Sequence, residues 1–205
     1  MAAICAAIAG GAWWYVVRRD RRAYTLPERA LEKWTLVTSD GTDSWVVGMK
    51  PPDTLVRSLL DEVSKRSGGS LHTPAHPAVP LVLRAEFDEG LQGVYGTDSI
   101  LKFAREDGVE STTFTPVCLA HQRRETDGGV ADVYFVPFES EAFNRMRVDL
   151  MPAFPEQAGV GIYDPATLTP ILIVAATDAS FDRWWPMTVD RERDCEAPLA
   201  AAAGH

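Results

Sequence analysis

Hydrophobic and polar positions along the chain form short runs that predict a mixture of strands and helices. Runs rich in β-branched and aromatic residues indicate strands, and an apolar face that recurs every three or four residues indicates a helix. The expected strands cover residues 33–39, 44–50, 78–87, 112–123, 130–138, 160–163 and 170–176. The expected helices cover residues 54–66, 99–106 and 139–146.

Turn signals between these runs indicate hairpins. Asp40-Gly41 separates the first two strands, and the glycine-rich segment ETDGG separates residues 112–123 from 130–138. The chain has no regular strand–helix–strand alternation, which argues against a doubly wound fold. The order predicts a single α+β domain with a largely antiparallel sheet built from hairpins and about three helices, preceded by one short N-terminal transmembrane helix.

The N-terminal run is the basis for that membrane helix. Residues 1–17 carry no charge and would span roughly 25 Å as a helix, slightly less than a ~30 Å hydrocarbon core. The order apolar, aromatic, basic is typical of a membrane helix that reaches the cytoplasmic interface. The residues expected at that interface are Trp13, Trp14, Tyr15, Arg18, Arg19, Arg21 and Arg22.

The position of the arginines predicts the orientation. They follow the apolar run, whereas a secretory signal has its basic residues first. By the positive-inside rule, the body would lie on the cytoplasmic side of a single-pass protein. Ala3, Ala7 and Gly11 recur at a spacing of four, which favours close packing against other membrane helices, although an alanine-rich run also contains such spacings by chance. Two alternatives to the membrane helix stay open, a misassigned start codon and a buried core helix, since a run this short is ambiguous.

These features divide the chain into four parts. Residues 1–17 are the expected membrane anchor and residues 18–32 a basic juxtamembrane link. Residues 33–189 are the expected α+β domain, and residues 190–205 the expected flexible tail.

Charge restricts the class of partner. The 205-residue chain has 20 basic and 29 acidic residues, a net charge of −9. The segment RRDRR holds four arginines and one aspartate, so 16 basic and 28 acidic residues remain outside it. Because phosphate contacts need clustered lysine and arginine, we expect no nucleic-acid partner. The three cysteines are an odd number without repeated spacing, which does not indicate a disulfide framework and fits a reducing compartment.

Four residues have side chains that could carry chemistry, namely His72, His76, Cys118 and His121. Their spacing matches no standard zinc module, and Pro74 separates the first two. Cys118 and His121 would point to opposite faces of a strand, which argues against a catalytic pair. We therefore predict no catalytic, metal or cofactor site, and the sequence does not predict whether the four residues converge.

Trp184 and Trp185 stand together near the C-terminus. Tryptophan is enriched in interface anchors, which makes them candidate interface residues; the competing interpretation is that one of them packs on the sheet. The resulting hypothesis is a non-catalytic accessory or interaction subunit of a membrane protein complex, with the membrane and other membrane subunits as partners. Two alternatives stay open: a membrane-tethered, hydrolase-like enzyme that uses His121, Cys118 and His72 or His76, and a ligand-sensing domain with a pocket between helices and sheet.

Overall fold

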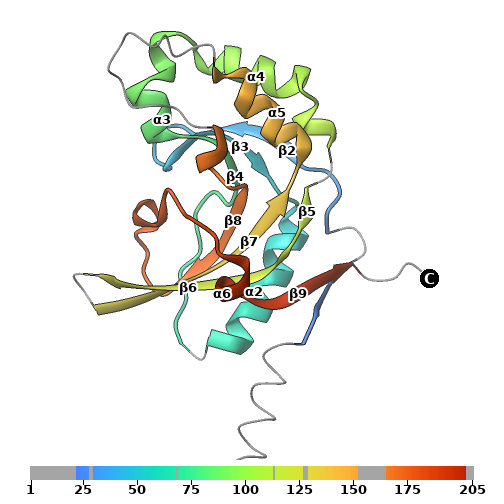
Figure 1. Ribbon diagram of the computed structural model, residues 1–205. Coiled ribbons are helices and arrows are strands. Elements are labelled where there is room, and N and C mark those ends of the chain that lie inside the picture. Colours follow the sequence, from blue (N-terminus) through green and yellow to red (C-terminus); the bar gives the residue numbers. More distant parts are fainter. Residues whose placement is uncertain are drawn as a thin grey trace, which may run out of the picture.

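The computed structural model describes residues 22–27, 30–67, 69–112, 114–126, 129–151 and 165–201 (Figure 1). The strands are β1 (Tyr24–Leu26), β2 (Thr35–Thr38), β3 (Trp45–Lys50), β4 (Val79–Leu83), β5 (Thr115–Pro116), β6 (Cys118–Thr126), β7 (Gly129–Glu139), β8 (Ile171–Ala176) and β9 (Cys195–Ala201). The helices are α2 (Asp53–Ser67), α3 (Arg84–Glu89), α4 (Thr97–Glu106), α5 (Glu141–Asp149) and α6 (Arg191–Asp194). Short 3₁₀ turns cover Leu91–Gly93, Val109–Ser111, Pro165–Thr167 and Phe181–Trp184.

The strands form two sheets. The larger sheet has the strand order β1-β9-β6-β7-β5. Its sixth strand, β8, lies outside this order and pairs with β7. The smaller sheet runs β2-β3-β4. Every pairing is antiparallel except that of β1 with β9, which is parallel. The chain is thus a mixed α+β domain whose described part contains five helices.

Strand β7 separates two cores because its side chains alternate between the faces of the sheet. Tyr134, Val136 and Phe138 point into the main core, which also takes in the smaller sheet and the buried faces of α2, α3, α4 and α5. Val133 and Phe135 point into a second, smaller core, which the segment 181–195 covers. Both faces of the sheet are therefore buried along most of β7.

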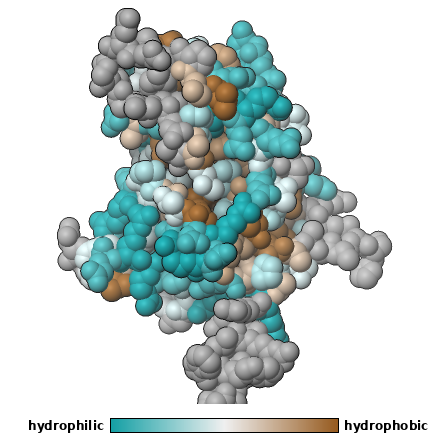
Figure 2. Space-filling model, viewed as in Figure 1, coloured by the Kyte–Doolittle hydropathy of each residue, from teal (hydrophilic) through white to brown (hydrophobic). Residues whose placement is uncertain are grey.

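Four of the five described helices lie in two places (Figure 1). α3, α4 and α5 gather at one end of the molecule beside the smaller sheet, and α2 packs against β8 and β1 of the larger sheet. The Tyr24 hydroxyl donates to the carbonyl of Ser58 at 2.7 Å, which ties β1 to α2. The face seen in Figure 2 is mostly hydrophilic, with apolar surface in small separate areas.

Much of the expected element order is confirmed. β2 and β3 form the first hairpin around the Asp40-Gly41 turn, and β6 and β7 form the second. α2 buries Leu55, Leu59 and Val63, the apolar face that the spacing predicts. The expected strand at residues 160–163 lies outside the described residues, and β8 pairs with β7.

Three expectations need correction. The strand expected at residues 78–87 stops at Leu83, and α3 follows, because Glu86 turns back to accept the N–H of Leu83 at 2.9 Å. Within the expected tail, residues 191–201 form α6 and β9, since β9 finds partners in β6 and β1. Residues 24–26 of the expected link form β1 for the same reason.

The expected membrane helix at residues 1–17 lies outside the described residues. In the part of the chain that the structure describes, no helix is both long enough and apolar enough to cross a membrane.

A buried ion pair connects the helical end to the smaller sheet. Arg147 of α5 is fully buried, and its two terminal nitrogens donate to the two carboxylate oxygens of Glu86 in α3 at 2.9 and 2.7 Å. The same guanidinium makes longer bonds, each of 3.4 Å, to the carbonyls of Leu81 and Pro165. A buried charge needs such compensation, since its desolvation costs several kcal/mol. The pair therefore holds α3, α5 and β4 together.

We predict that Arg147→Met lowers the free energy of unfolding by about 3–5 kcal/mol, because it leaves the Glu86 carboxylate without its main partner. Urea denaturation measures the change. The matched control is Arg191→Gln, which breaks an exposed ion pair to Glu139 and should cost at most about 1 kcal/mol. An Arg147→Met protein as stable as the Arg191→Gln protein would contradict a structural role for the buried pair.

Candidate functional site

Three segments that are distant in sequence surround a pocket of about 710 Å³. The segments are the turn Thr42–Trp45 between β2 and β3, the loop Leu71–Ala78 between α2 and β4, and the segment Ala179–Trp185 after β8. Its volume lies within the range of small-molecule sites. We call this cavity the His76 pocket.

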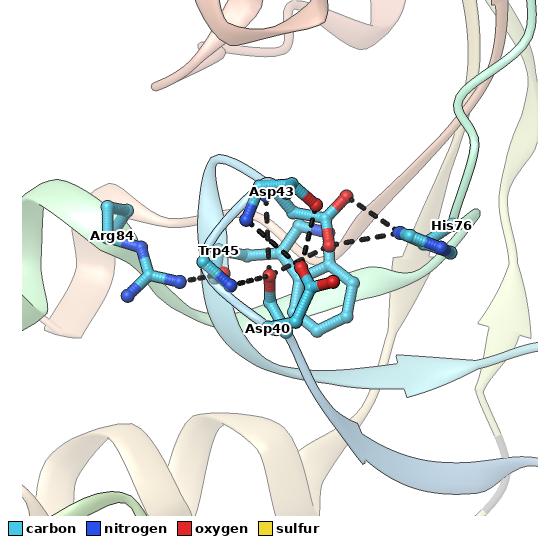
Figure 3. A network of polar contacts seen from close by, with 8 residues as sticks. Asp40, Asp43, Trp45, His76 and Arg84 are labelled. Carbon is cyan, nitrogen blue, oxygen red and sulfur yellow. Dashed lines mark hydrogen bonds and ion pairs between the residues drawn. The ribbon is translucent and has the colours of Figure 1, made fainter.

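His76 is oriented by a carboxylate at the wall of this pocket (Figure 3). Its Nδ1 lies 3.3 Å from Oδ2 and 3.4 Å from Oδ1 of Asp43, and the Ser39 hydroxyl donates to Oδ2 of Asp43 at 2.8 Å. The Asp43 side chain is 16% exposed and the His76 side chain 58% exposed. The carboxylate therefore fixes one edge of the imidazole, and the ring itself stays accessible.

The turn that carries Asp43 is held by its own side chains. Oδ1 of Asp40 accepts from the hydroxyl and the N–H of Thr42 at 2.7 and 3.1 Å, which lowers the pKa of Asp40. The Ser39 hydroxyl oxygen accepts from the N–H groups of Gly41 and Asp43. Gly41 has a φ of 108°, which glycine adopts without strain. The Asp-Gly sequence thus produces both the hairpin and the position of the carboxylate.

His72 lines the same pocket but has a different attachment. The backbone N–H of His72 donates to the carbonyl of Ala176 at 2.7 Å, and the carbonyl of His72 accepts from the N–H of Ala176 at 2.9 Å. These two bonds attach the loop to the end of β8. A second cavity of about 370 Å³ shares Asp43, Trp45, Ala75, His76 and Ala78 with the first. The two histidines therefore converge on one pocket, and His76 lines both cavities.

Cys118 and His121 lie elsewhere. Cys118 forms a disulfide with Cys195 across β6 and β9, with a Cα–Cα distance of 5.7 Å. The cysteine count and spacing do not predict this disulfide, because it depends on the pairing of β6 with β9, which brings together residues 77 positions apart. As a disulfide, Cys118 has no thiol with which to attack a substrate or bind a metal.

His121 is clamped between two carboxylates on the other face of the sheet. Its Nε2 lies 2.8 Å from Oδ1 of Asp132 on β7, and its Nδ1 lies 3.1 Å from Oε1 of Glu196 on β9. The ring stacks on Tyr134 with centroids 4.8 Å apart, and Arg123 donates to Asp132 at 2.8 Å. The bond to Glu196, followed by that to Asp132, raises the pKa of His121 despite its partial burial. Both ring nitrogens of His121 thus contact carboxylates on the neighbouring strands β7 and β9.

No protein-family model, curated protein or solved structure matches this chain. The arrangement of its residues is therefore the basis for assigning its function.

Among the described residues, no three histidine, cysteine, aspartate or glutamate side chains are grouped to hold a metal ion.

The two candidate interface tryptophans have different environments. Trp184 is fully buried in the second core, with the Arg124 guanidinium 5.0 Å from the centre of its ring. Trp185 is half-buried and lines the His76 pocket. Trp184 therefore packs on the sheet, and Trp185 remains available to a ligand.

The expected membrane-interface and helix-packing residues fall almost entirely outside the described residues. Those residues are Trp13, Trp14, Tyr15, Arg18, Arg19 and Arg21, together with Ala3, Ala7 and Gly11. The described chain begins at Arg22, which is exposed and whose carbonyl accepts a 3.4 Å bond from Arg66.

Sequence reasoning missed Asp43, Trp45 and Phe181 as pocket residues. Asp43 lies in the DGTD turn, which carries a clear hairpin signal. Its contact with His76 crosses 33 residues of sequence, and no local pattern reveals that proximity.

We predict that His121 makes stability depend on pH above about pH 6.5. The pKa of His121 is higher in the folded state than in the unfolded state. Its protonated form therefore stabilises the folded protein fully below the pKa of the unfolded state, and this stabilisation is lost as pH rises through the pKa of the folded state. The native protein should therefore have a higher free energy of unfolding than the His121→Gln variant. This difference should be largest at about pH 6 and should shrink towards about pH 9. Urea denaturation across this range measures it.

Glu196→Gln is the matched variant for this experiment, since it removes the largest cause of the shift and keeps the side-chain size. It should flatten the pH dependence in part. Parallel curves for the native protein and His121→Gln over the whole range would refute the clamp.

Proposed function

We propose that this chain is a non-catalytic binding domain that takes a small ligand in the His76 pocket and serves as an accessory subunit at a membrane. The observation that carries the proposal is the convergence of three loops from separate parts of the chain on one concave site. Aromatic rings line it together with a comparable share of polar side chains, and convergent polar groups fix the orientation of a small ligand. This is the ligand-sensing alternative combined with the accessory role.

The placement of the reactive residues supports binding over catalysis. Cys118 is in a disulfide, and His121 has both nitrogens on carboxylates. At the pocket, the Ser39 hydroxyl donates to Asp43 and not to an imidazole, so a histidine does not activate it as a nucleophile.

One observation favours a second candidate, a hydrolase-like enzyme. Asp43 holds Nδ1 of His76, which leaves Nε2 directed away from that carboxylate (Figure 3). An aspartate that orients a histidine in this way is the arrangement found in general-base catalysis. Here His76 would activate a water molecule bound in the pocket.

The position of β1 supports the membrane tether. Tyr24–Leu26 pairs with β9, so the large sheet begins only a few residues after the basic cluster. A helix formed by residues 1–17 would then connect to the body through a short link. A domain held close to a membrane partner gains effective concentration.

Two features point to opposite sides of that membrane. The arginines that follow residue 17 support a body on the cytoplasmic side. The Cys118–Cys195 disulfide supports an oxidising compartment, since cytosolic thiols are kept reduced. We give more weight to the disulfide, because it joins residues of the folded body itself.

The binding role predicts a ligand-dependent rise in the thermal midpoint. A library of neutral, cationic and anionic metabolites should contain compounds that stabilise the full-length protein. A ligand present at 100 times its Kd adds about 2.7 kcal/mol, which corresponds to a shift of roughly 5–10 °C for a chain of this size. Differential scanning fluorimetry reads the midpoint.

Ser180→Trp is the control for this screen, because Ser180 is exposed and lines the His76 pocket. The variant should fold with an unchanged midpoint and lose the ligand response. Turnover of a compound that disappears in His76→Gln would favour the hydrolase instead, and a library without any stabilising compound would sink the binding role.

The accessory role and the compartment can be tested in one preparation. Free thiols are alkylated in intact cells that carry a Cys5→Ser version, which leaves only Cys118 and Cys195 to follow. The tagged protein is then isolated from native membranes in mild detergent. Mass spectrometry should find membrane proteins in stoichiometric amounts, and both cysteines should escape alkylation until a reductant is added.

The two readouts are independent. Recovery as a lone monomer would rule out the accessory role. Alkylation of both cysteines without reductant would support the cytoplasmic side that the arginine cluster predicts.

A further inference from the structure

The His76 pocket has a one-sided charge. Among the described residues, its lining includes the carboxylates of Asp43 and Asp182 and contains neither lysine nor arginine. The chain as a whole carries a net charge of −9. Clefts lined by one sign of charge attract ligands of the opposite sign, so this pocket disfavours an anion.

The two carboxylates are not equivalent. Asp43 is already bound by His76 and by the Ser39 hydroxyl. The Asp182 side chain is exposed, and within the described part of the chain it makes no hydrogen bond or ion pair. Asp182 is therefore the carboxylate that remains available to a ligand.

Aromatic rings supply the second recognition element. Trp45, Phe181 and Trp185 line the pocket, and Leu71 and Ile173 add aliphatic surface. The face of an aromatic ring attracts a cation through its quadrupole, most strongly for tryptophan. The same rings and aliphatic side chains bury the apolar part of a ligand.

We infer that the ligand of the His76 pocket is a small organic cation, an ammonium group attached to an apolar body. The ammonium group would lie between the Asp182 carboxylate and the indole of Trp185, with the apolar body against the remaining rings. This inference rests on the proposed binding function and names its ligand class. A neutral ligand of the same shape would leave the charge of Asp182 unused.

Three probes of one shape test the role of charge: phenethylamine, neutral 2-phenylethanol and anionic 3-phenylpropionate. Isothermal titration calorimetry on the full-length protein should show that phenethylamine binds at least about tenfold more tightly than 2-phenylethanol, a difference of about 1.4 kcal/mol. The anion should bind most weakly. Choline and spermidine extend the cation series.

Variants locate the effect. Asp182→Asn should weaken the binding of phenethylamine about tenfold and leave the affinity for 2-phenylethanol unchanged. Asp61→Asn removes an exposed carboxylate on α2, outside the pocket, and should change neither. Ser180→Lys should weaken the binding of phenethylamine more than Ser180→Gln does, since the lysine and glutamine side chains differ mainly in charge.

The outcomes separate this inference from the binding function. If 2-phenylethanol or the anion binds as tightly as the amine, or if neutral library compounds alone stabilise the protein, the inference is overturned and the binding function stands. If no probe and no library compound binds while the protein unfolds cooperatively, both fail.

Discussion

The ion pair between Arg147 and Glu86 is the constraint on which the arrangement of the helical end depends. A guanidinium with no exposed surface is stable only with a carboxylate in reach, and Glu86 reaches it because α3 starts directly after β4. The same carboxylate accepts the N–H of Leu83 at the end of that strand. One side chain thus ends a strand, supports the first turn of a helix and neutralises a buried charge. The pair thus supports β4, which also pairs with β3 in the smaller sheet.

The His76 pocket depends in turn on how the two sheets are joined. The loop that carries His72 and His76 runs from α2 to β4, and the backbone of His72 pairs with Ala176 at the end of β8. β8 also leads into the segment with Phe181 and Trp185. The pocket therefore forms where β8 meets the entry to β4, with the β2–β3 turn as its third wall. Loops held by rigid sheets at such a junction are a common location for binding residues.

The sequence predicts the local parts of this fold and not its long-range contacts. The apolar spacing from Leu55 to Val63 predicts α2, and the Asp40-Gly41 turn predicts the first hairpin, because both signals lie within a few residues. α3 was missed because its start depends on one side-chain bond, from the N–H of Leu83 to Glu86, and the ion pair that holds Glu86 joins it to Arg147, 61 residues away. β9 was missed because its seven residues become a strand only by pairing with β6 and β1. The His76–Asp43 contact likewise belongs to the tertiary structure, and the four candidate residues separate into a pocket, a disulfide and a charge clamp.

Two of those three groups act on the same strand. The disulfide fastens β9 to β6 on one face of the sheet, and His121 attracts Glu196 of β9 on the other. β9 in turn holds β1, the first strand that follows the N-terminal segment. Cys118, Cys195 and His121, of residue types often associated with catalysis, here stabilise the strand that holds β1 in the sheet. Of the four candidate residues, Cys118 and His121 thus stabilise the sheet, whereas His72 and His76 line the pocket together with aromatic rings and aspartates.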